Sequence, residues 1–180
     1  MKTTTIILSV AAIGLAGTAS AATPRHVMHV PAPVAPPEVT YVYAAPDAPI
    51  ASTVVVPPGY ATVYLSGMIP GVTHPEAEKG SIASFGTTEE QTESVLGKIQ
   101  AALKAQGIDF KDVVSMHVYL AGDPGNGGKM DFAGMMKAYS RHFGTTDQPH
   151  RPTRATVQVA ALAAPGFLVE IECVAVKPVG

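Results

Sequence analysis

Two helical and five strand-like segments alternate along the chain, and their order restricts the fold more than any other feature. Residues 88–106 carry apolar side chains at helical spacing and follow a capping-box signal, Thr87 with Glu90 and Thr88 with Gln91. A second helix is expected from Asp131 to Phe143. Strand patterns fall at 51–56, 61–67, 112–122, 154–159 and 167–176. The order β-β-α-β-α-β-β predicts an α+β domain with a mixed sheet.

Two helices can cover only one face of such a sheet, so the second face needs another cover. The last strand alternates an apolar set with a mixed set: Val169, Ile171, Cys173 and Ala175 against Glu170, Glu172, Val174 and Val176. We assign the apolar set to the helix side. A face that carries both valines and acids is interpreted as an interface between copies of the chain, with a polar site at its edge, in preference to a solvated surface.

Arg154 stands at the head of a strand with strict period-two alternation, "RATVQV". It could be solvated, paired with a protein acid, or kept for an acidic ligand. If the last two strands form a hairpin, Gln158 falls near Glu172, and Glu170 lies roughly 20 Å from Arg154. An ion pair between Arg154 and Glu170 within one chain is therefore not expected, and a cleft between subunits becomes the natural site.

The N-terminal residues 1–21 hold an early lysine, an apolar run and the triplet Ala-Ser-Ala, which predicts a signal peptide cleaved after Ala21. The run is shorter than the ~20 residues that span a bilayer, so no membrane span is expected after cleavage. A periplasmic or secreted protein follows. Residues 22–49, rich in Pro and Ala, predict an extended tether that a short β run at 39–44 could interrupt, with the folded domain over 50–178.

Composition argues against several classes of function. The formal charge of −2, the lack of Trp and the absence of a basic run do not fit a nucleic-acid binder. Cys173 is the only cysteine, so an intramolecular disulfide is impossible. The six histidines form no H-x-H or H-E-x-x-H arrangement, and the glycines at 125–128 lack the context of a phosphate loop. We expect neither a metal nor a cofactor.

Five ordered blocks of sequence resemble one known family. They read "VYLSGMIPG", "EEQTESVLGKIQAALKAQGIDFKDVVSMHVYL", "DFAGMMKAYSRHFG", "RPTRATVQVAAL" and "VEIECVAV". From about Ile50 to Lys177 the chain resembles the reactive-intermediate deaminase family, also called the YjgF or RidA family. The resemblance implies a chorismate-mutase-like α+β domain that assembles as a homotrimer, with clefts between subunits.

The resemblance also implies a reaction and two catalytic residues. In such proteins the arginine of the "RP.R" block, here Arg154, holds the carboxylate of a 2-imino or 2-enamino acid. Water adds to the imine carbon, and ammonia and a 2-oxo acid leave. The first glutamate of the "EIE" block, here Glu170, is linked in the family to orienting that water. A guanidinium suits the first role because it offers a carboxylate two parallel donors.

The same resemblance suggests a wider substrate-binding set. The backbone of Ser66 and Gly67 is expected to line the cleft. Three further positions depart from the family pattern: Thr156 replaces a cysteine, Met136 an asparagine and Ile50 a tyrosine. These departures leave two classes of function open. The first is an exported imine deaminase, and the second is a non-catalytic trimer that binds small carboxylates in the same clefts.

Overall fold

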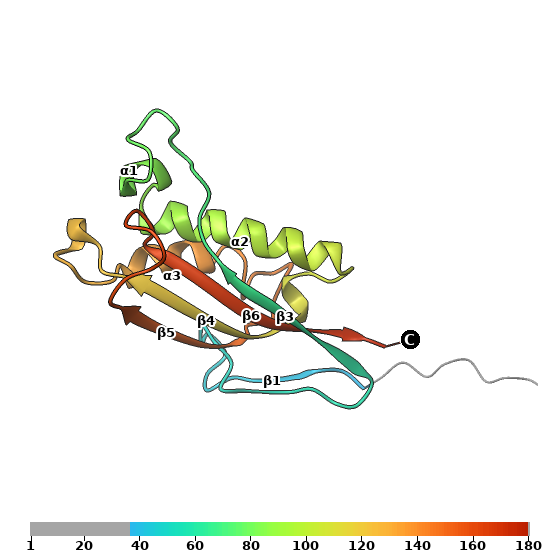
Figure 1. Ribbon diagram of the computed structural model, residues 1–180. Helices are drawn as coiled ribbons and strands as arrows, with labels where there is room; N and C mark the ends of the chain where they lie inside the picture. Colours follow the sequence, from blue (N-terminus) through green and yellow to red (C-terminus); the bar gives the residue numbers. More distant parts are fainter. Residues whose placement is uncertain (1–36, 180) are drawn as a thin grey trace, which may run out of the picture. The chain divides into compact units, whose positions relative to one another are not determined.

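A mixed four-stranded sheet with two helices on one face forms the centre of the domain in the computed structural model, which describes residues 37–179. The strand order is β3 (Tyr60–Met68), β6 (Val169–Pro178), β4 (Val113–Ala121) and β5 (Thr153–Val159). β6 runs antiparallel to both of its neighbours, whereas β4 and β5 are parallel. Helices α2 (Thr88–Ala105) and α3 (Phe132–Tyr139) lie on the same side (Figure 1). The predicted α+β fold is confirmed.

Helix α2 contributes one side of the hydrophobic core. Its buried side chains include Val95, Leu96, Ile99 and Leu103, all fully shielded from solvent. They pack with the inward-facing residues of the two central strands, Met116, Val118, Leu120, Ile171, Cys173 and Ala175. The helix begins with the expected capping box, in which the Thr87 hydroxyl accepts from the Glu90 amide and the Glu90 carboxylate accepts from the Thr87 amide at 2.8 Å.

The second long helix is shorter than the sequence suggests. α3 ends at Tyr139 rather than at Phe143, because Arg141 and His142 donate to carbonyl groups three residues back, Ala138 and Tyr139, and so close a turn. Three short helices complete the described chain: α1 (Ile82–Phe85), η1 (Phe110–Asp112) and η2 (Pro124–Asn126).

A small hairpin packs on the sheet face away from the helices (Figure 1). β1 (Thr40–Val42) pairs with β2 (Thr53–Val55) in a sheet of their own. The Tyr41 hydroxyl donates to the carbonyl oxygens of Lys111 and Val113 at 3.1 and 3.2 Å, which fixes the hairpin to the start of β4. The hairpin covers one end of the second face, and the rest of that face stays open.

The folded domain extends upstream of residue 50, where the tether was expected to end. The Arg151 guanidinium donates to the carbonyl oxygens of Pro46 and Ala48, and it stacks 4.1 Å from the ring centroid of Tyr43. Residues 37–49 are therefore bound to the domain, because their backbone carbonyls and tyrosines find partners there. The predicted signal peptide and the start of the tether lie outside the described residues.

The hypothesis that the last two strands form a hairpin is wrong. β4 lies between β5 and β6, with Met116 in register with Arg154 on one side and with Cys173 on the other. The reason is the connection through α3, since a strand that returns after a helical crossover pairs in parallel with the strand before it. Gln158 is consequently opposite Leu120, not near Glu172.

Candidate functional site

Arg154 projects from β5 toward the helices, not toward the open face. Residues in register share a face, and Arg154 pairs with Met116, which is fully buried in the core. Its guanidinium carbon lies 4.2 Å from the ring centroid of Tyr139 in α3, and Nη2 lies 3.1 Å from Sδ of Met136. Arg154, on the edge strand β5, is thus enclosed between an aromatic ring and a thioether from the C-terminal half of α3.

The guanidinium of Arg154 lacks an anionic partner within residues 37–179. The ion pairs of this part of the chain involve other cations. Nη1 is buried and forms no hydrogen bond. Burial lowers the pKa of Arg154 from its ordinary value, but an arginine remains charged at neutral pH. A partly buried cation without an acidic partner is costly, which makes Arg154 a candidate for binding an anion from outside the chain.

A second orphaned polar atom lies two residues further along the same face. The hydroxyl oxygen of Thr156 is buried and has no hydrogen-bond partner within the described chain. Gln158, the next residue on this face, is by contrast satisfied: it accepts from the Met130 amide at 2.9 Å and donates to the Gly128 carbonyl at 3.0 Å. Buried polar groups usually find partners, so the unsatisfied atoms of Arg154 and Thr156 make this corner of the sheet a candidate ligand site.

The structure places Ile50 close to the start of β5, which carries Arg154. Its neighbour Pro49 accepts a hydrogen bond from the Tyr139 hydroxyl at 3.1 Å, and Ala51 donates to the Pro152 carbonyl at 3.0 Å. These two bonds hold Ile50 beside the start of β5. Four residues from the sequence-predicted set, Arg154, Thr156, Met136 and Ile50, therefore gather at one corner, which we call the arginine site.

The other predicted residues form a second group on the opposite face. Glu170 pairs with Tyr119, and Ser66 and Gly67 lie in a bulge of β3 between Leu65 and Met68. A Cβ atom added to Gly67 would collide with Oε1 of Glu170, so the carboxylate lies directly on the glycine backbone. Glu170, Ser66 and Gly67 are called the glutamate site below. No ion pair joins it to Arg154 in one copy of the chain.

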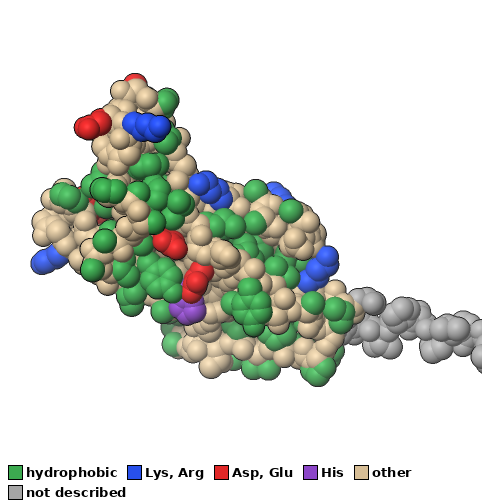
Figure 2. Space-filling model, viewed as in Figure 1, with side chains coloured by type: hydrophobic (Ala, Val, Ile, Leu, Met, Phe, Trp, Pro, Cys, Tyr) green, Lys and Arg blue, Asp and Glu red, His purple; other side chains and the backbone are tan. Residues whose placement is uncertain are grey.

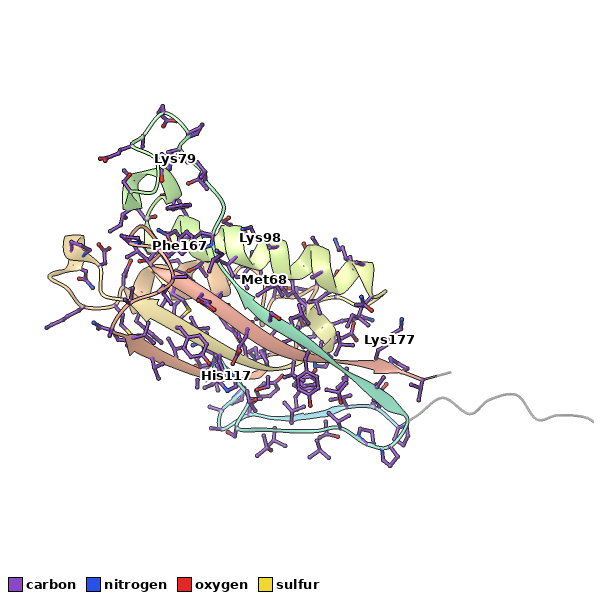
Figure 3. All side chains as sticks on the ribbon, in the orientation of Figure 1. Met68, Lys79, Lys98, His117, Phe167 and Lys177 are labelled. Carbon is purple, nitrogen blue, oxygen red and sulfur yellow. The ribbon has the colours of Figure 1, made fainter. Side chains whose placement is uncertain are left out.

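The open face carries a polar network that sequence reasoning missed. The carboxylate of Glu172 accepts from the Tyr119 hydroxyl at 2.8 Å and lies 3.2 Å from Nδ1 of His117. The hydrogen bond to Glu172 raises the pKa of Tyr119. Figure 2 shows acidic side chains beside a histidine among hydrophobic ones, and Figure 3 places His117 on the side of the sheet away from Lys98 of α2.

The same face exposes apolar side chains around this network. Tyr64, which pairs with Val174, is 80% exposed, and Val157, which pairs with Tyr119, is 48% exposed. In the sequence of β4, His117 and Tyr119 alternate with the apolar core residues and so belong to the open face. This alternation was the sequence signal that could have placed both residues on the same face as Glu172. The mixed face predicted from β6 is therefore present, and a polar pair from β4 extends it.

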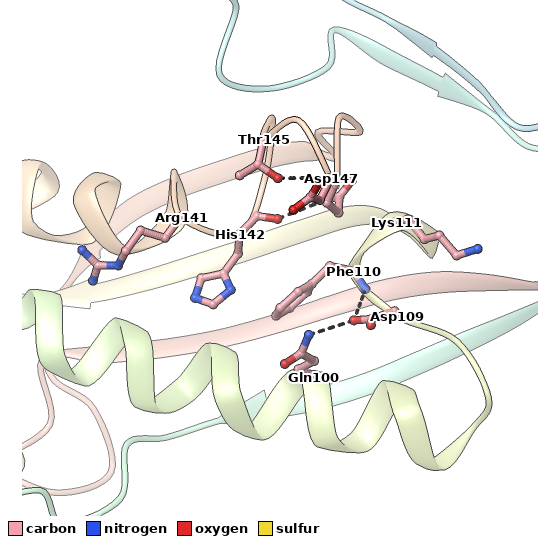
Figure 4. A pocket seen from close by; sticks show the side chains of 9 residues that line it. Gln100, Asp109, Phe110, Lys111, Arg141, His142, Thr145 and Asp147 are labelled. Atoms are coloured by element: carbon pink, nitrogen blue, oxygen red, sulfur yellow. Dashed lines mark hydrogen bonds between the residues drawn. The ribbon is translucent and has the colours of Figure 1, made fainter.

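A separate pocket of about 380 Å³ opens between α2, η1 and the segment after α3 (Figure 4). Several of its polar groups already have partners within the chain. Gln100 donates to Asp109 at 3.1 Å, and the ring of His142 lies 2.6 Å from Glu93. Arg141 binds Glu89 and Glu93. No sequence-predicted site residue lines this pocket, and we assign it a structural role.

Metal and membrane features are limited in the part of the chain that the structure describes. Within residues 37–179, no three His, Cys, Asp or Glu side chains converge into a group that could hold a metal ion. In the same range, no helix combines the length and apolarity that a bilayer crossing requires.

Comparison with known proteins agrees with this architecture. Residues 44–177 match the family model described as Endoribonuclease L-PSP. The chain belongs to this family. A YjgF-family protein of Neisseria meningitidis with a solved structure is 29% identical over 79% of this chain and 98% of its own, with a TM-score of 0.50. The resemblance to the YjgF or RidA family inferred from the sequence blocks is thereby confirmed.

Two further proteins of known name are similar in sequence to this chain. Protein DfrA of Myxococcus xanthus is 38% identical over 72% of this chain and 86% of its own length. The human 2-iminobutanoate/2-iminopropanoate deaminase is 36% identical over 64% of this chain and 73% of its own. The range matched by the family model, residues 44–177, includes both groups of site residues.

Proposed function

We propose that the protein hydrolyses 2-imino or 2-enamino acids to 2-oxo acids and ammonia. The observation that carries the proposal is the partly buried guanidinium of Arg154, which has no anionic partner within residues 37–179 and lies near the unsatisfied hydroxyl of Thr156. A carboxylate is the anion that a guanidinium binds with two parallel hydrogen bonds. Relatives named 2-iminobutanoate/2-iminopropanoate deaminase support a carboxylate next to an imine.

The proposed reaction needs one water and no cofactor. The oxygen of water forms a bond to C2 of the imine and gives up one proton, while the C=N electrons move to nitrogen, which takes up a proton. As the C–N bond of the resulting carbinolamine breaks, its hydroxyl proton is transferred to nitrogen, so that ammonia leaves and the C=O bond of the 2-oxo acid forms. Glu170 would accept a hydrogen bond from the attacking water and so hold it against C2. Arg154 would fix the substrate so that C2 meets this water.

The two groups cannot act on one substrate within a single copy, since they lie on opposite faces of the sheet. We therefore propose a homotrimer in which the arginine site of one subunit meets the glutamate site of its neighbour. Exposed Tyr64 and Val157 supply apolar contact area on the open face. β3 and β5 are the edge strands of the four-stranded sheet, and such edges favour association with another copy.

A carboxylate-binding protein without catalysis is the second candidate. The observation that favours it is the contact between the thioether of Met136 and Nη2 of Arg154. A polar side chain at position 136 could have oriented the reacting group of a substrate, whereas a thioether offers only a weak acceptor. Such a protein would bind 2-oxo acids with the same dependence on Arg154. It would release no ammonia from an imine.

Ammonia release from freshly generated 2-iminopropanoate separates these functions. Wild type should accelerate release, Arg154→Ala should abolish it, and Arg154→Lys should retain at most about a tenth because the second aligned donor is lost, a factor that corresponds to roughly 1.4 kcal/mol. Arg141→Ala is the matched control, since Arg141 is bound to Glu89 and Glu93 away from the site. Binding of pyruvate without acceleration would favour the second candidate, and activity equal to wild type in Arg154→Ala would refute both.

We also propose that the protein is exported, on the basis of the signal-peptide pattern in residues 1–21. The mature chain should then begin at Ala22. Mass spectrometry of protein purified from a native periplasmic or secreted fraction measures this directly. Intact Met1 in that material would contradict the cleavage.

A further inference from the structure

The accessible side of the arginine site is formed by apolar side chains of α3. Phe132 and Met136 are four residues apart, so they share one stripe of the helix. Sδ of Met136 lies 3.1 Å from Nη2 of Arg154, and the ring centroid of Phe132 lies 5.9 Å from the guanidinium carbon. Phe132 is 44% exposed and so can be reached by a ligand. A ligand on Arg154 would therefore meet these two side chains.

Met136 also covers the group that the ligand must reach. Nη1 of Arg154 is buried, and Nη2 is in contact with a thioether, which is a weak acceptor. A carboxylate can replace this contact only if the side chain of Met136 turns aside. Methionine is suited to that movement, because its unbranched side chain has three rotatable bonds and little preference among packing arrangements.

Apart from the Thr156 hydroxyl and the buried Nε of Arg151, which form no hydrogen bond within residues 37–179, the surroundings offer little to a second acidic or polar group on the ligand. The two Nη atoms of Arg151, the other arginine near the start of β5, donate to the carbonyl oxygens of Pro46 and Ala48. Tyr139 uses its hydroxyl to donate to Pro49. A polar substituent placed against Met136 and Phe132 would lose water without gaining a partner, whereas an apolar one would gain contact area.

We propose that Met136 is the specificity-determining residue of the arginine site and that it selects 2-oxo and 2-imino acids whose substituent is apolar and longer than a methyl group. The displaced thioether packs against that substituent, and Phe132 forms the other wall. This inference rests on the proposed carboxylate binding by Arg154. Because an apolar pocket distinguishes ligands by about tenfold or more per methylene group, branched-chain 2-oxo acids should bind at least about tenfold tighter than pyruvate.

Calorimetric titration tests the preference with three acids: pyruvate, 4-methyl-2-oxopentanoate and 2-oxoglutarate. Wild type should bind the second at least about tenfold tighter than the first and third, with a more negative heat-capacity change. Met136→Leu should keep this order. Met136→Gln is similar in length but provides a strong acceptor for Arg154, so it should weaken all three acids and reduce the preference to less than about threefold. Lys137→Ala is the control, because Lys137 is exposed and lies beside Glu89.

The outcomes distinguish this inference from the proposed function. If folded wild type binds none of the three acids, carboxylate binding by Arg154 fails, and the selectivity fails with it. If wild type binds pyruvate and 4-methyl-2-oxopentanoate within about threefold of each other, the selectivity is wrong and the function stands. An unchanged preference in folded Met136→Gln would likewise refute the role of Met136. Circular dichroism shows whether each variant is folded. If Met136→Gln does not fold, the ratio of the wild-type affinities for 4-methyl-2-oxopentanoate and pyruvate decides whether the selectivity exists.

Discussion

Arg154 and Glu170 belong to the same sheet but project from opposite faces of it. Arg154 is in register with the buried Met116, whereas Glu170 is in register with Tyr119 on the open face. β4 separates the two strands that carry them. Any reaction that uses both groups on one substrate therefore requires two copies of the chain, and the proposed trimer is part of the mechanism rather than an accessory to it.

Gly67→Ala should inactivate the protein by displacing Glu170. The added Cβ would collide with Oε1 of Glu170, and the carboxylate would have to move from the position proposed for orienting water. We expect ammonia release to fall by more than about tenfold, while pyruvate binding by Arg154 changes by less than about threefold. Gly97→Ala provides the control, because a Cβ there meets no atom within 4 Å. Full activity in Gly67→Ala would show that the carboxylate position is unimportant.

Tyr139→Phe should reduce stability with little effect on ligand binding. The substitution removes the hydrogen bond from the hydroxyl to the Pro49 carbonyl, at 3.1 Å, but keeps the ring that stacks on Arg154. Loss of this buried bond should cost about 1 kcal/mol in the free energy of unfolding, measured by urea titration. Tyr60→Phe serves for comparison. A change in pyruvate affinity greater than about fivefold would mean that the hydroxyl acts on the ligand.

The capping box at the start of α2 should make stability depend on acidity. Hydrogen bonds from the backbone and hydroxyl of Thr87 lower the pKa of Glu90. A carboxyl group with a lowered folded-state pKa stabilises the fold above its unfolded value, about 4.3, and this contribution is lost as the pH falls through the folded value. Wild type should thus exceed Glu90→Gln in stability at pH 7, and the difference should close by about pH 3.

Glu78→Gln is the control for this comparison, since Glu78 is an exposed residue outside the capping box. Its difference from wild type should be small at both pH values. A gap between wild type and Glu90→Gln that stays the same size from neutral to acidic pH would show that the charge of Glu90 contributes nothing.

Cys173 should be unreactive in the folded protein. Burial, followed by the charge of Glu172, raises the pKa of its thiol to about 12, so little thiolate exists near neutral pH. Iodoacetamide at pH 8 should leave native protein unmodified and should label one thiol per chain after denaturation, as the single cysteine requires. Rapid labelling of native protein would place Cys173 outside the core.

Much of the fold could be predicted because its signals are local. The capping box at Thr87 and the apolar spacing of Leu96, Ile99 and Leu103 define α2, and strict alternation separates Glu170 and Glu172 from the core side of β6. The strand pairing could not be derived in the same way, because alternation fixes which residues share a face but not which strand lies next to which. The wrong prediction of a hairpin between β5 and β6 has this cause, since the structure places β4 between them.

The candidate site was predictable only as a set of residue types. The family resemblance selected Arg154, Thr156, Met136 and Ile50 together with Glu170, and the structure divides this set between two faces. The contacts that characterise Arg154, the Tyr139 ring and the Met136 thioether, depend on how α3 crosses β5. Packing of this kind is set by tertiary structure, and no periodic pattern in the sequence reports it.

Complementation between two inactive variants tests the central claim most directly, namely that one site takes Arg154 from one copy and Glu170 from another. Arg154→Ala and Glu170→Gln should each release almost no ammonia from 2-iminopropanoate. Co-expressed in equal amounts, they should recover activity, because about one site in four of randomly mixed trimers would contain both native residues. Mixed oligomers that stay as inactive as either variant alone would contradict the account.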